Sequence, residues 1–546
     1  MLTGSPFRNR YWYKGSVFYE IYIDLFNDSN NDGIGDIRGL INNFIYIKEL
    51  GIGCLWLLPI YKSPLMDGGY DVSDYTSIRK EVGSLDDFQE LIKVAHDNDI
   101  RIIMDLVLNH TSSQHHWFIA SQDPSSKDFS KYKDYYLWDM TGDKYKDASV
   151  IFSDYEKTNW TYSPIRKEYY FHRFYKTQPD LNWRNEEVLQ EFFKIISFWL
   201  DLGVDGFRVD AVPYLVKREG TTCENLKETH MILRKIRRFA NKHYRNRNIV
   251  FLAEAGEPMN ELVKYFGNGR NEFQMAFNFP LMPQIFLSLL DEDSKYIIDT
   301  IKSFPKIPRQ TQWAIFLRNH DELSLSTVDQ DTASLFYSKY DKDKIYRFNT
   351  GIAERLYTLL GDNKEKIALA NSILLTLVGT PVLYSGDELD EKENFSMVPK
   401  DNVPYDRRLL VRTKIDWAKA NKYIWDSQST YNKLRNMLII RKRYKDIFAH
   451  SDIHIINTGN NNIFAYLRVF HHKNLIFINN LSKKKQLIDT NNLGIFHFSV
   501  LIVERADVAG NIIELKPYSY IWVKVMTENQ LIRNNLISKL SLFKRF

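Results

Sequence analysis

The chain has 546 residues, of which 44% are hydrophobic and 26% are charged; this excludes a disordered or fibrous protein and predicts more than one domain. Its net charge of +5 is the small difference between 73 basic and 68 acidic residues, so we expect no nucleic-acid partner. The N-terminus lacks the apolar core of a signal peptide, and no stretch reaches about 18 uninterrupted apolar residues. We therefore expect no membrane partner and a cytoplasmic location.

Short apolar runs alternate with amphipathic, helix-like stretches through most of the chain, which predicts parallel strands joined by helical crossovers. The eight runs are residues 17–23, 54–58, 101–107, 206–209, 250–253, 275–277, 313–317 and 381–384. The clearest amphipathic stretches are 85–98, 188–202 and 225–243. This number of runs favours a closed (β/α)8 TIM barrel over an open doubly wound sheet, although periodicity alone does not separate the two. Polar residues cluster just after the runs, where barrel enzymes build their active sites.

Two stretches depart from this alternation. Residues 111–183 are aromatic, polar and irregular, which predicts a small domain inserted after the third strand, because such long loops are rare in compact barrels. Strand-like runs at 463–469, 475–478, 496–502 and 518–525 predict a C-terminal antiparallel β-sandwich domain over 451–526. The barrel then comprises 1–110 and 184–450. The basic tail, 527–546, fits a membrane-touching amphipathic segment or a terminal helix or frayed end, and we favour the latter.

Three carboxylates, Asp210, Glu254 and Asp321, each follow a predicted barrel strand. Retaining cleavage of a glycosidic bond needs one carboxylate as nucleophile and one carboxylic acid as proton donor, about 5–5.5 Å apart. Arg208 lies two residues before Asp210, so both side chains point to the same side of a strand, where the guanidinium would keep Asp210 ionised. A single Asp at a strand end is more often a cap or an ion-pair partner. Here four strand ends all carry Asp, Glu, His or Arg.

The residues at these four strand ends resemble the signature regions of the glycoside hydrolase family of α-amylases and α-glucosidases. The regions read DLVLNH (105–110), GFRVDAVPY (206–214), FLAEA (251–255) and FLRNHDEL (316–323). The resemblance implies that Asp210 is the nucleophile, Glu254 the general acid/base and Asp321 the third carboxylate, which holds sugar hydroxyls. It also implies that three side chains donate hydrogen bonds in the glucose pocket: His110, Arg208 and His320.

Further stretches narrow the resemblance to the oligo-1,6-glucosidase-like subgroup. QPDLNW begins at Gln178 and is similar to members with a pocket for a terminal glucose, as opposed to an open polysaccharide cleft. DGGYDVSDY places Asp67 and Tyr70 where the subgroup has a blocking aspartate and a stacking tyrosine. Phe174 matches another pocket aromatic, and Arg412 matches the arginine expected to pair with Asp67.

Outside these regions the sequence is most similar to family members that interconvert maltose and trehalose. The similarity implies α-glucosyl transfer within the disaccharide, through a covalent glucosyl-enzyme, with side hydrolysis to glucose and no organic cofactor. Departures near Gly256 and Lys414 are expected toward the acceptor side, so an α-glucosidase that admits water is the alternative. A non-catalytic binding relative is a weaker one. Maltose and trehalose are the expected partners, and a homo-oligomer is left open.

A metal loop is predicted in DSNNDGIGD (28–36), which has oxygen donors at the one-three-five-nine spacing of calcium ligands. These donors are Asp28, Asn30, Asp32 and Asp36. Gly39 occupies the position where an EF-hand needs its bidentate Glu, so this is no EF-hand, and a solvated turn explains the string equally well. Resemblance to the family's calcium loop, in which the Ile34 carbonyl also ligates, favours a structural Ca²⁺. His115 and His116 lack acidic partners at ligand spacing and are expected at the surface.

Overall fold

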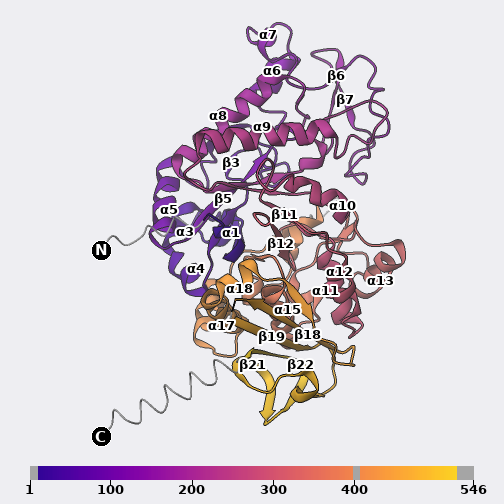
Figure 1. Cartoon of the computed structure of the whole chain (residues 1–546). Helices are drawn as coiled ribbons and strands as arrows, with labels where there is room; N and C mark the ends of the chain where they lie inside the picture. Colours follow the sequence, from indigo (N-terminus) through magenta and orange to yellow (C-terminus); the bar gives the residue numbers. More distant parts are fainter. Residues whose placement is uncertain (1–9, 398–405, 472, 526–546) are drawn as a thin grey trace.

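The computed structural model describes residues 10–397, 406–471 and 473–525, and eight parallel strands form a closed barrel at its centre (Figure 1). In chain order the barrel strands are β1 (Phe18–Ile21), β2 (Cys54–Leu57), β5 (Arg101–Val107), β9 (Gly206–Asp210), β10 (Val250–Ala253), β11 (Met275–Phe277), β12 (Gln312–Phe316) and β16 (Thr380–Tyr384). The last strand, β16, closes the barrel by pairing with β1. Each strand coincides with one of the eight apolar runs, so the predicted (β/α)8 fold is confirmed.

The barrel strands are apolar throughout because both of their faces are covered. Every residue of β5 and β9 is buried, as expected for a parallel strand between the barrel interior and a layer of helices. The helices of eight or more residues in the described chain are α5 (Leu85–Asp97), α8 (Glu186–Leu202), α9 (Lys227–His243), α11 (Leu281–Leu290), α12 (Lys295–Ser303), α13 (Gln330–Tyr340), α15 (Lys364–Thr376), α16 (Trp417–Trp425) and α17 (Thr430–Arg443). The ends of these helices carry local signals: a capping box at Ser84 begins α5, and Gly203, with a φ of 120°, ends α8.

The insertion between β5 and β9 is a small domain at the end of the molecule opposite the C-terminal sheet (Figure 1). It contains α6 (His116–Gln122), α7 (Phe129–Tyr132) and a three-stranded antiparallel sheet of β6 (Trp138–Asp139), β8 (Glu168–Phe171) and β7 (Trp160–Ser163). Its last segment, QPDLNW, runs antiparallel to the end of β5 through a bridge between His110 and Asp180. His115, expected at the surface, is buried instead: it accepts a hydrogen bond from the Trp117 amide at 3.1 Å and its ring packs on Tyr75.

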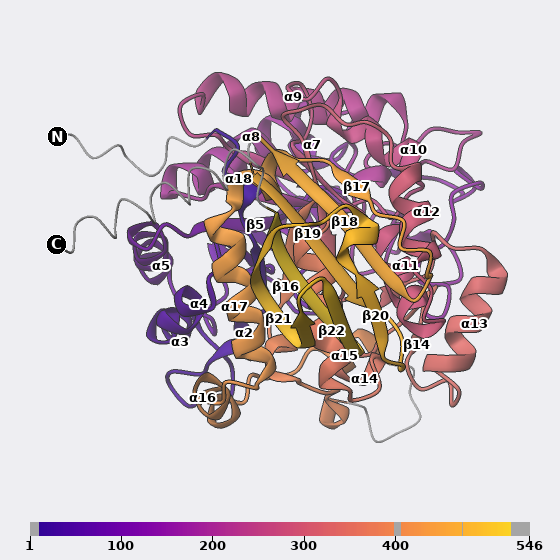
Figure 2. The same cartoon turned by 60° about the horizontal axis from the view of Figure 1, so that its bottom comes forward.

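The C-terminal domain is an antiparallel sheet of six strands in the described residues (Figure 2). The strands are β17 (Ile453–Ile455), β18 (Ile463–Phe470), β19 (Lys473–Asn480), β20 (Gln486–Asp489), β21 (Phe498–Ala509) and β22 (Ile512–Val525). The first half of β22 pairs with β20 and its second half with β19. Apolar side chains from both halves of this one sheet join in a single cluster, among them Ile476, Ile488 and Leu515. The antiparallel domain is therefore confirmed, but a single connected sheet builds it instead of two separate ones.

Arg468 fastens this sheet to the barrel. Its buried guanidinium donates to the carbonyls of Thr376 and Leu377, at 2.9 and 2.7 Å, where α15 ends.

The predicted basic tail, 527–546, lies outside the described residues. Within the described ranges, no helix combines the length and apolarity that a membrane span requires. The cytoplasmic location stays a prediction.

Candidate active site

The three predicted carboxylates line one pocket at the C-terminal end of the barrel strands. Asp210 is the last residue of β9, Glu254 directly follows β10, and Asp321 lies in the segment after β12. All three line a pocket of about 410 Å³. This volume falls in the range of small-ligand sites, so the pocket suits a small sugar and not a long polymer.

Arg208 lies at the centre of the site, where one guanidinium meets three carboxylates. It is in register with Asp105 on the neighbouring strand β5, so both side chains enter the barrel at the same level. Arg208 donates to Asp210 Oδ1 at 2.7 Å and forms ion pairs with Asp105 and Glu254. Asp105 also accepts a hydrogen bond from Trp56 Nε1 at 2.8 Å. Burial raises the pKa of Asp105 to about 6, although Arg208 opposes this rise.

Asp210 and Glu254 both lie against Arg208, at the ends of neighbouring strands. Burial raises the pKa of Asp210 well above its usual value, Arg208 acts against this rise, and the charge of Glu254 adds to it. The expected ionisation of Asp210 by Arg208 stays a prediction. A retaining site needs one carboxylate and one carboxylic acid close together, and these two side chains are placed for that combination.

Asp321 is the carboxylate of this site that is kept ionised. His320 Nε2 lies 3.2 Å from its Oδ2, and Arg408 and Arg412 each lie 3.4 Å from its Oδ1. Burial opposes the charge, yet His320, Arg408 and Arg412 hold the pKa of Asp321 far below its usual range. A carboxylate that is fixed in the charged form beside the nucleophile can accept hydrogen bonds from sugar hydroxyls.

Tyr70 lines the pocket, and His320 packs against it. The His320 ring stacks on Tyr70 with centroids 5.6 Å apart, and its Nε2 lies 2.9 Å from the Tyr70 hydroxyl. Its Nδ1 lies 2.5 Å from Glu20 Oε1 at the end of β1. Burial lowers the pKa of His320 well below its usual value, although the charge of Asp321 opposes this effect.

A polar wall joins the inserted domain to the barrel. Gln178 donates from Nε2 to Asp67 Oδ2 at 2.9 Å, and the same nitrogen lies 3.1 Å from His110 Nε2. Burial lowers the pKa of His110 to about 4. The Phe174 ring packs edge-on against His110 with centroids 5.3 Å apart. The structure thus brings these four predicted residues together on one side of the pocket.

The arginine that pairs with Asp67 is Arg408. The prediction that Arg412 forms this pair is wrong. Arg408 Nη2 donates to Asp67 Oδ1 at 2.7 Å and to Asp406 Oδ2 at 2.5 Å. Arg412 instead donates from Nε to the His320 carbonyl at 3.4 Å. Arg408 lies in the segment between residues 388 and 410, where the resemblance to the family is lost. The motif match could therefore not reveal that an arginine four positions earlier takes this place.

We expect Arg408→Lys to lower kcat/KM on maltose, the substrate that the sequence predicts, roughly ten- to a hundredfold, because an ammonium cannot replace the forked hydrogen bonds to Asp67 and Asp406. Arg407→Lys is the control, since Arg407 is the neighbour of Arg408 in the same segment but is not among the residues that line the pocket. Arg407 donates instead to the carbonyls of Lys344 and Arg347. Steady-state kinetics on both variants measure the effect. An unchanged kcat/KM in Arg408→Lys would show that this arginine does not shape the glucose site.

A buried ion pair between Lys217 and Asp180 holds the polar wall in place. The Lys217 ammonium also donates to Asn109 Oδ1 at 2.9 Å and to the Tyr214 carbonyl at 2.6 Å. Both charged side chains are fully buried. Nothing in the pattern around Lys217 signalled this contact, because its partners lie in the first and second signature regions and in QPDLNW, far apart in the sequence.

Segments without recognised motifs surround the rest of the pocket. Residues 149–152 of the inserted domain contribute on one side, and a small sheet of β13 (Leu323–Ser324), β15 (Gly351–Ile352) and β14 (Arg347–Phe348) stands on the other. Glu322 also lines the pocket, and burial raises its pKa to about 7. Gly256 lines the pocket as expected for the acceptor side, whereas Lys414 does not: its ammonium donates to the Gly33 carbonyl.

The predicted calcium loop is closed by its own backbone. Asp28 accepts hydrogen bonds from the amides of Asn31 and Gly33 at 2.7 and 2.8 Å, and Asp36 caps α3 (Ile37–Asn42) through the Gly39 amide at 2.6 Å. Across the residues that the structure describes, no group of three or more His, Cys, Asp or Glu side chains is placed to hold a metal ion. The carboxylates of this loop therefore bind backbone amides and do not converge on one point, and calcium binding stays a prediction.

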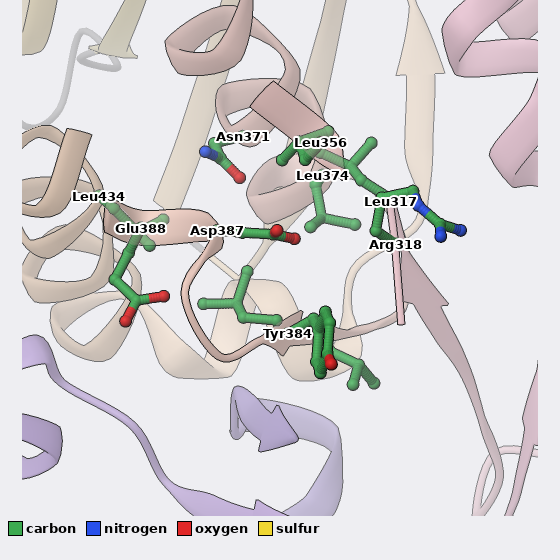
Figure 3. A pocket seen from close by; sticks show the side chains of 11 residues that line it. Leu317, Arg318, Leu356, Asn371, Leu374, Tyr384, Asp387, Glu388 and Leu434 are labelled. Atoms are coloured by element: carbon green, nitrogen blue, oxygen red, sulfur yellow. The ribbon is translucent and has the colours of Figure 1, made fainter. Parts of the chain in front are cut away.

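A separate cavity of about 10 Å³ lies behind β16, between this strand, α15 and α17 (Figure 3). Its walls combine leucines with polar side chains such as Asn371, Asp387 and Glu388. The volume holds about one water molecule. This cavity is therefore excluded as a site for a sugar.

Comparison with known proteins finds matches over most of the chain. The family model "Alpha amylase, catalytic domain" matches residues 20–352. Trehalose synthase/amylase TreS of Mycolicibacterium smegmatis is 41% identical over 88% of this chain and 86% of its own length. Trehalose synthase of Thermus thermophilus is 39% identical over 88% of this chain and 51% of its length, and oligo-1,6-glucosidase of Bacillus cereus is 31% identical over 93% and 98%.

Solved structures resemble this chain along almost its whole length. Trehalulose synthase MutB in complex with Tris superimposes with a TM-score of 0.75, at 25% identity, over 94% of this chain and 100% of that one. Isomaltulose synthase SmuA from Protaminobacter rubrum gives a TM-score of 0.73 at 26% identity, over 94% and 99%.

Proposed function

Because the chain belongs to the α-amylase family and is an enzyme, we propose that it interconverts maltose and trehalose by retaining transfer of a glucosyl group within the disaccharide. The observation that carries most weight is the pocket lined by Asp210, Glu254 and Asp321, in which the first two carboxylates are both held by Arg208. Similarity to proteins named trehalose synthase, at 39–41% identity over 88% of the chain, supports the choice of substrate.

The proposed first step cleaves maltose and forms a glucosyl-enzyme. Glu254 gives its proton to the bridging oxygen as that oxygen leaves, while Asp210 attacks the anomeric carbon and forms a covalent bond with inverted configuration. Arg208 holds both side chains and stabilises Asp210 as its charge is needed. Tyr70, backed by the stacked ring of His320, borders the glucose ring, and Asp321 accepts hydrogen bonds from the glucose hydroxyls.

In the proposed second step, the freed glucose stays in the pocket and rotates, so that its anomeric hydroxyl faces the glucosyl-enzyme. Glu254 now removes the proton from its anomeric hydroxyl, and that oxygen attacks the glucosyl-enzyme and expels Asp210. The product is the α,α-1,1 linkage of trehalose. Water must be kept from the intermediate, because any water that reaches it gives glucose. Residues 149–152 and the sheet of β13, β15 and β14 border the pocket, and we assign them the role of keeping water out.

An α-glucosidase is the second candidate, and the small residues on the acceptor side favour it. Gly256, Ser324 and Ser326 line the pocket there and bring little bulk against water. The B. cereus oligo-1,6-glucosidase, at 31% identity, belongs to the same family.

We expect maltose incubated with the enzyme to give trehalose as the main product and glucose as the minor one. Chromatography of the sugars over time measures both, and trehalose as the starting sugar should return maltose. Glucose as the sole product from maltose would replace the proposal with the α-glucosidase. The absence of any turnover would favour a non-catalytic relative.

We also propose that the loop at residues 28–36 binds a structural calcium ion, on the strength of its ligand spacing. An ion that binds only the folded chain raises its stability by mass action. Excess EGTA should therefore lower the Tm by a few degrees, calcium should restore it, and Asp32→Asn should remove the response. An equal Tm in EGTA and in calcium would show that the loop needs no ion. The Lys414 contact and the loop's own hydrogen bonds would then be enough to hold its conformation.

A further inference from the structure

An arginine-lined pocket opens on the opposite face of the barrel from the carboxylates. It has a volume of about 270 Å³ and lies at the N-terminal ends of β10 and β11. Four arginines line it, from the segment before β1, from α9 and its end, and from the turn before β11: Arg10, Arg237, Arg245 and Arg270. The other polar groups of the lining are Tyr11, Tyr13, Asn241, Asn248, Gln274 and Gln310. Among the described residues that line this pocket, none is Asp or Glu.

The positive charge of this pocket is not balanced by the protein. Among the described residues, no carboxylate forms an ion pair with any of the four arginines. This differs from the active site, where Arg208 meets three carboxylates and Arg408 meets Asp67 and Asp406. Arg10, Arg245 and Arg270 are exposed and Arg237 is half-buried, so an anion from solvent can reach the pocket. Like charges that share a pocket repel one another, and an anion between them relieves that repulsion.

Arg237 has one donor that is buried and unpaired. Its Nη1 donates to the Ile249 carbonyl at 2.7 Å, but its buried Nε meets no hydrogen-bond acceptor among the described residues. Burial lowers the pKa of Arg237 to about 10, against a smaller opposite effect of Tyr13. Buried donors without a partner are rare in proteins, and one in a polar pocket is typical of a site for a ligand or a water.

We propose that this pocket binds a small phosphate-bearing metabolite, whose phosphate oxygens accept hydrogen bonds from the arginines. Guanidinium groups match phosphate oxygens in both charge and forked geometry. The pocket is larger than a single phosphate group requires and approaches the volume of small-ligand sites, so there is room for an organic part. The rings of Tyr11 and Tyr13, 6.5 Å apart and nearly perpendicular, border that room. This inference does not depend on the proposed reaction at the other end of the barrel.

Binding can be tested on the full-length enzyme with inorganic phosphate, glucose 6-phosphate and sodium chloride at matched ionic strength. We expect both phosphate compounds to raise the Tm and to give saturable heats in calorimetric titration, and chloride to do neither. Tighter binding of glucose 6-phosphate would identify a phosphate ester as the ligand, and equal binding would identify free phosphate. Both results support the site.

The matched variants remove charge without changing the half-buried Arg237. Arg245→Gln with Arg270→Gln should weaken phosphate binding at least roughly tenfold, since two charge-assisted hydrogen bonds to the phosphate are lost. Arg238→Gln is the control, because Arg238 lies on the same helix α9 but lines a different groove. The double lysine variant keeps the charge and should retain part of the affinity. The proposal is overturned if wild type responds to phosphate no more than to chloride, or if the double Gln variant binds as tightly as wild type.

Discussion

Asp210→Asn should lower kcat on maltose by at least roughly a thousandfold while the protein stays folded. An amide oxygen cannot attack the anomeric carbon as a carboxylate does, so the glucosyl-enzyme is not formed. The fold should tolerate the change, because Asn keeps the shape of Asp and removes a charge that lies beside Glu254 and Asp105. Arg208 keeps two of its three carboxylate partners in this variant. Product formation and the Tm, measured on the same sample, separate loss of chemistry from loss of folding.

The control for this variant is Asp201→Asn, since Asp201 accepts a hydrogen bond from the Tyr244 hydroxyl at 2.8 Å on the exposed side of α8. Its activity should stay at the wild-type level. Residual turnover in Asp210→Asn above about one part in a thousand would count against Asp210 as the nucleophile.

Glu254→Gln should lower kcat on maltose by about 10²–10⁴-fold, the usual contribution of a general acid/base. The loss should depend on the leaving group. α-Glucosyl fluoride needs no proton from the enzyme, so this variant should still form the glucosyl-enzyme from it. Azide, a nucleophile that needs no general base, should then accept the glucosyl group and give α-glucosyl azide. The measurements are the initial rates on maltose and on the fluoride, with and without azide.

The same substrates applied to Asp210→Asn provide the contrast. Without the nucleophile, azide should not yield the α-configured product, because retention requires two successive inversions at the anomeric carbon. Near-normal turnover of maltose by Glu254→Gln, or equal losses on maltose and on the fluoride, would mean that another group delivers the proton.

The sequence predicted those parts of the molecule in which a local pattern has one physical explanation. A run such as VFLA before Glu254 is apolar throughout because β10 is covered on both faces. Arg208 and Asp210 are two residues apart on a strand, so their meeting follows from the alternation of side chains. The eight barrel strands and the residues gathered around Arg208 could be predicted for this reason.

The residues that were missed depend on contacts between distant segments. Arg408 lies in a loop whose sequence does not resemble the family, and Lys217 has no neighbours in the sequence that indicate its partners. Arg412 was predicted to pair with Asp67, but Arg408 makes that contact and Arg412 donates to the His320 carbonyl. A motif match gives the identity of a residue but not the partner of its side chain. The acceptor side had no motif at all: the short strands β13, β14 and β15 contain two residues each, too few for a periodic pattern.

The ion pair between Lys217 and Asp180 limits how this enzyme can exchange parts with its relatives. Asp180 belongs to the inserted domain, whereas Lys217 follows β9, beyond the end of that insertion. A chimera that replaced residues 111–183 with a segment lacking the acid would leave a fully buried ammonium without its counter-charge, which typically destabilises a protein by about 3–5 kcal/mol. The stability of the inserted domain depends on a residue outside it. Recombination that preserves the fold must therefore transfer the inserted domain together with Lys217.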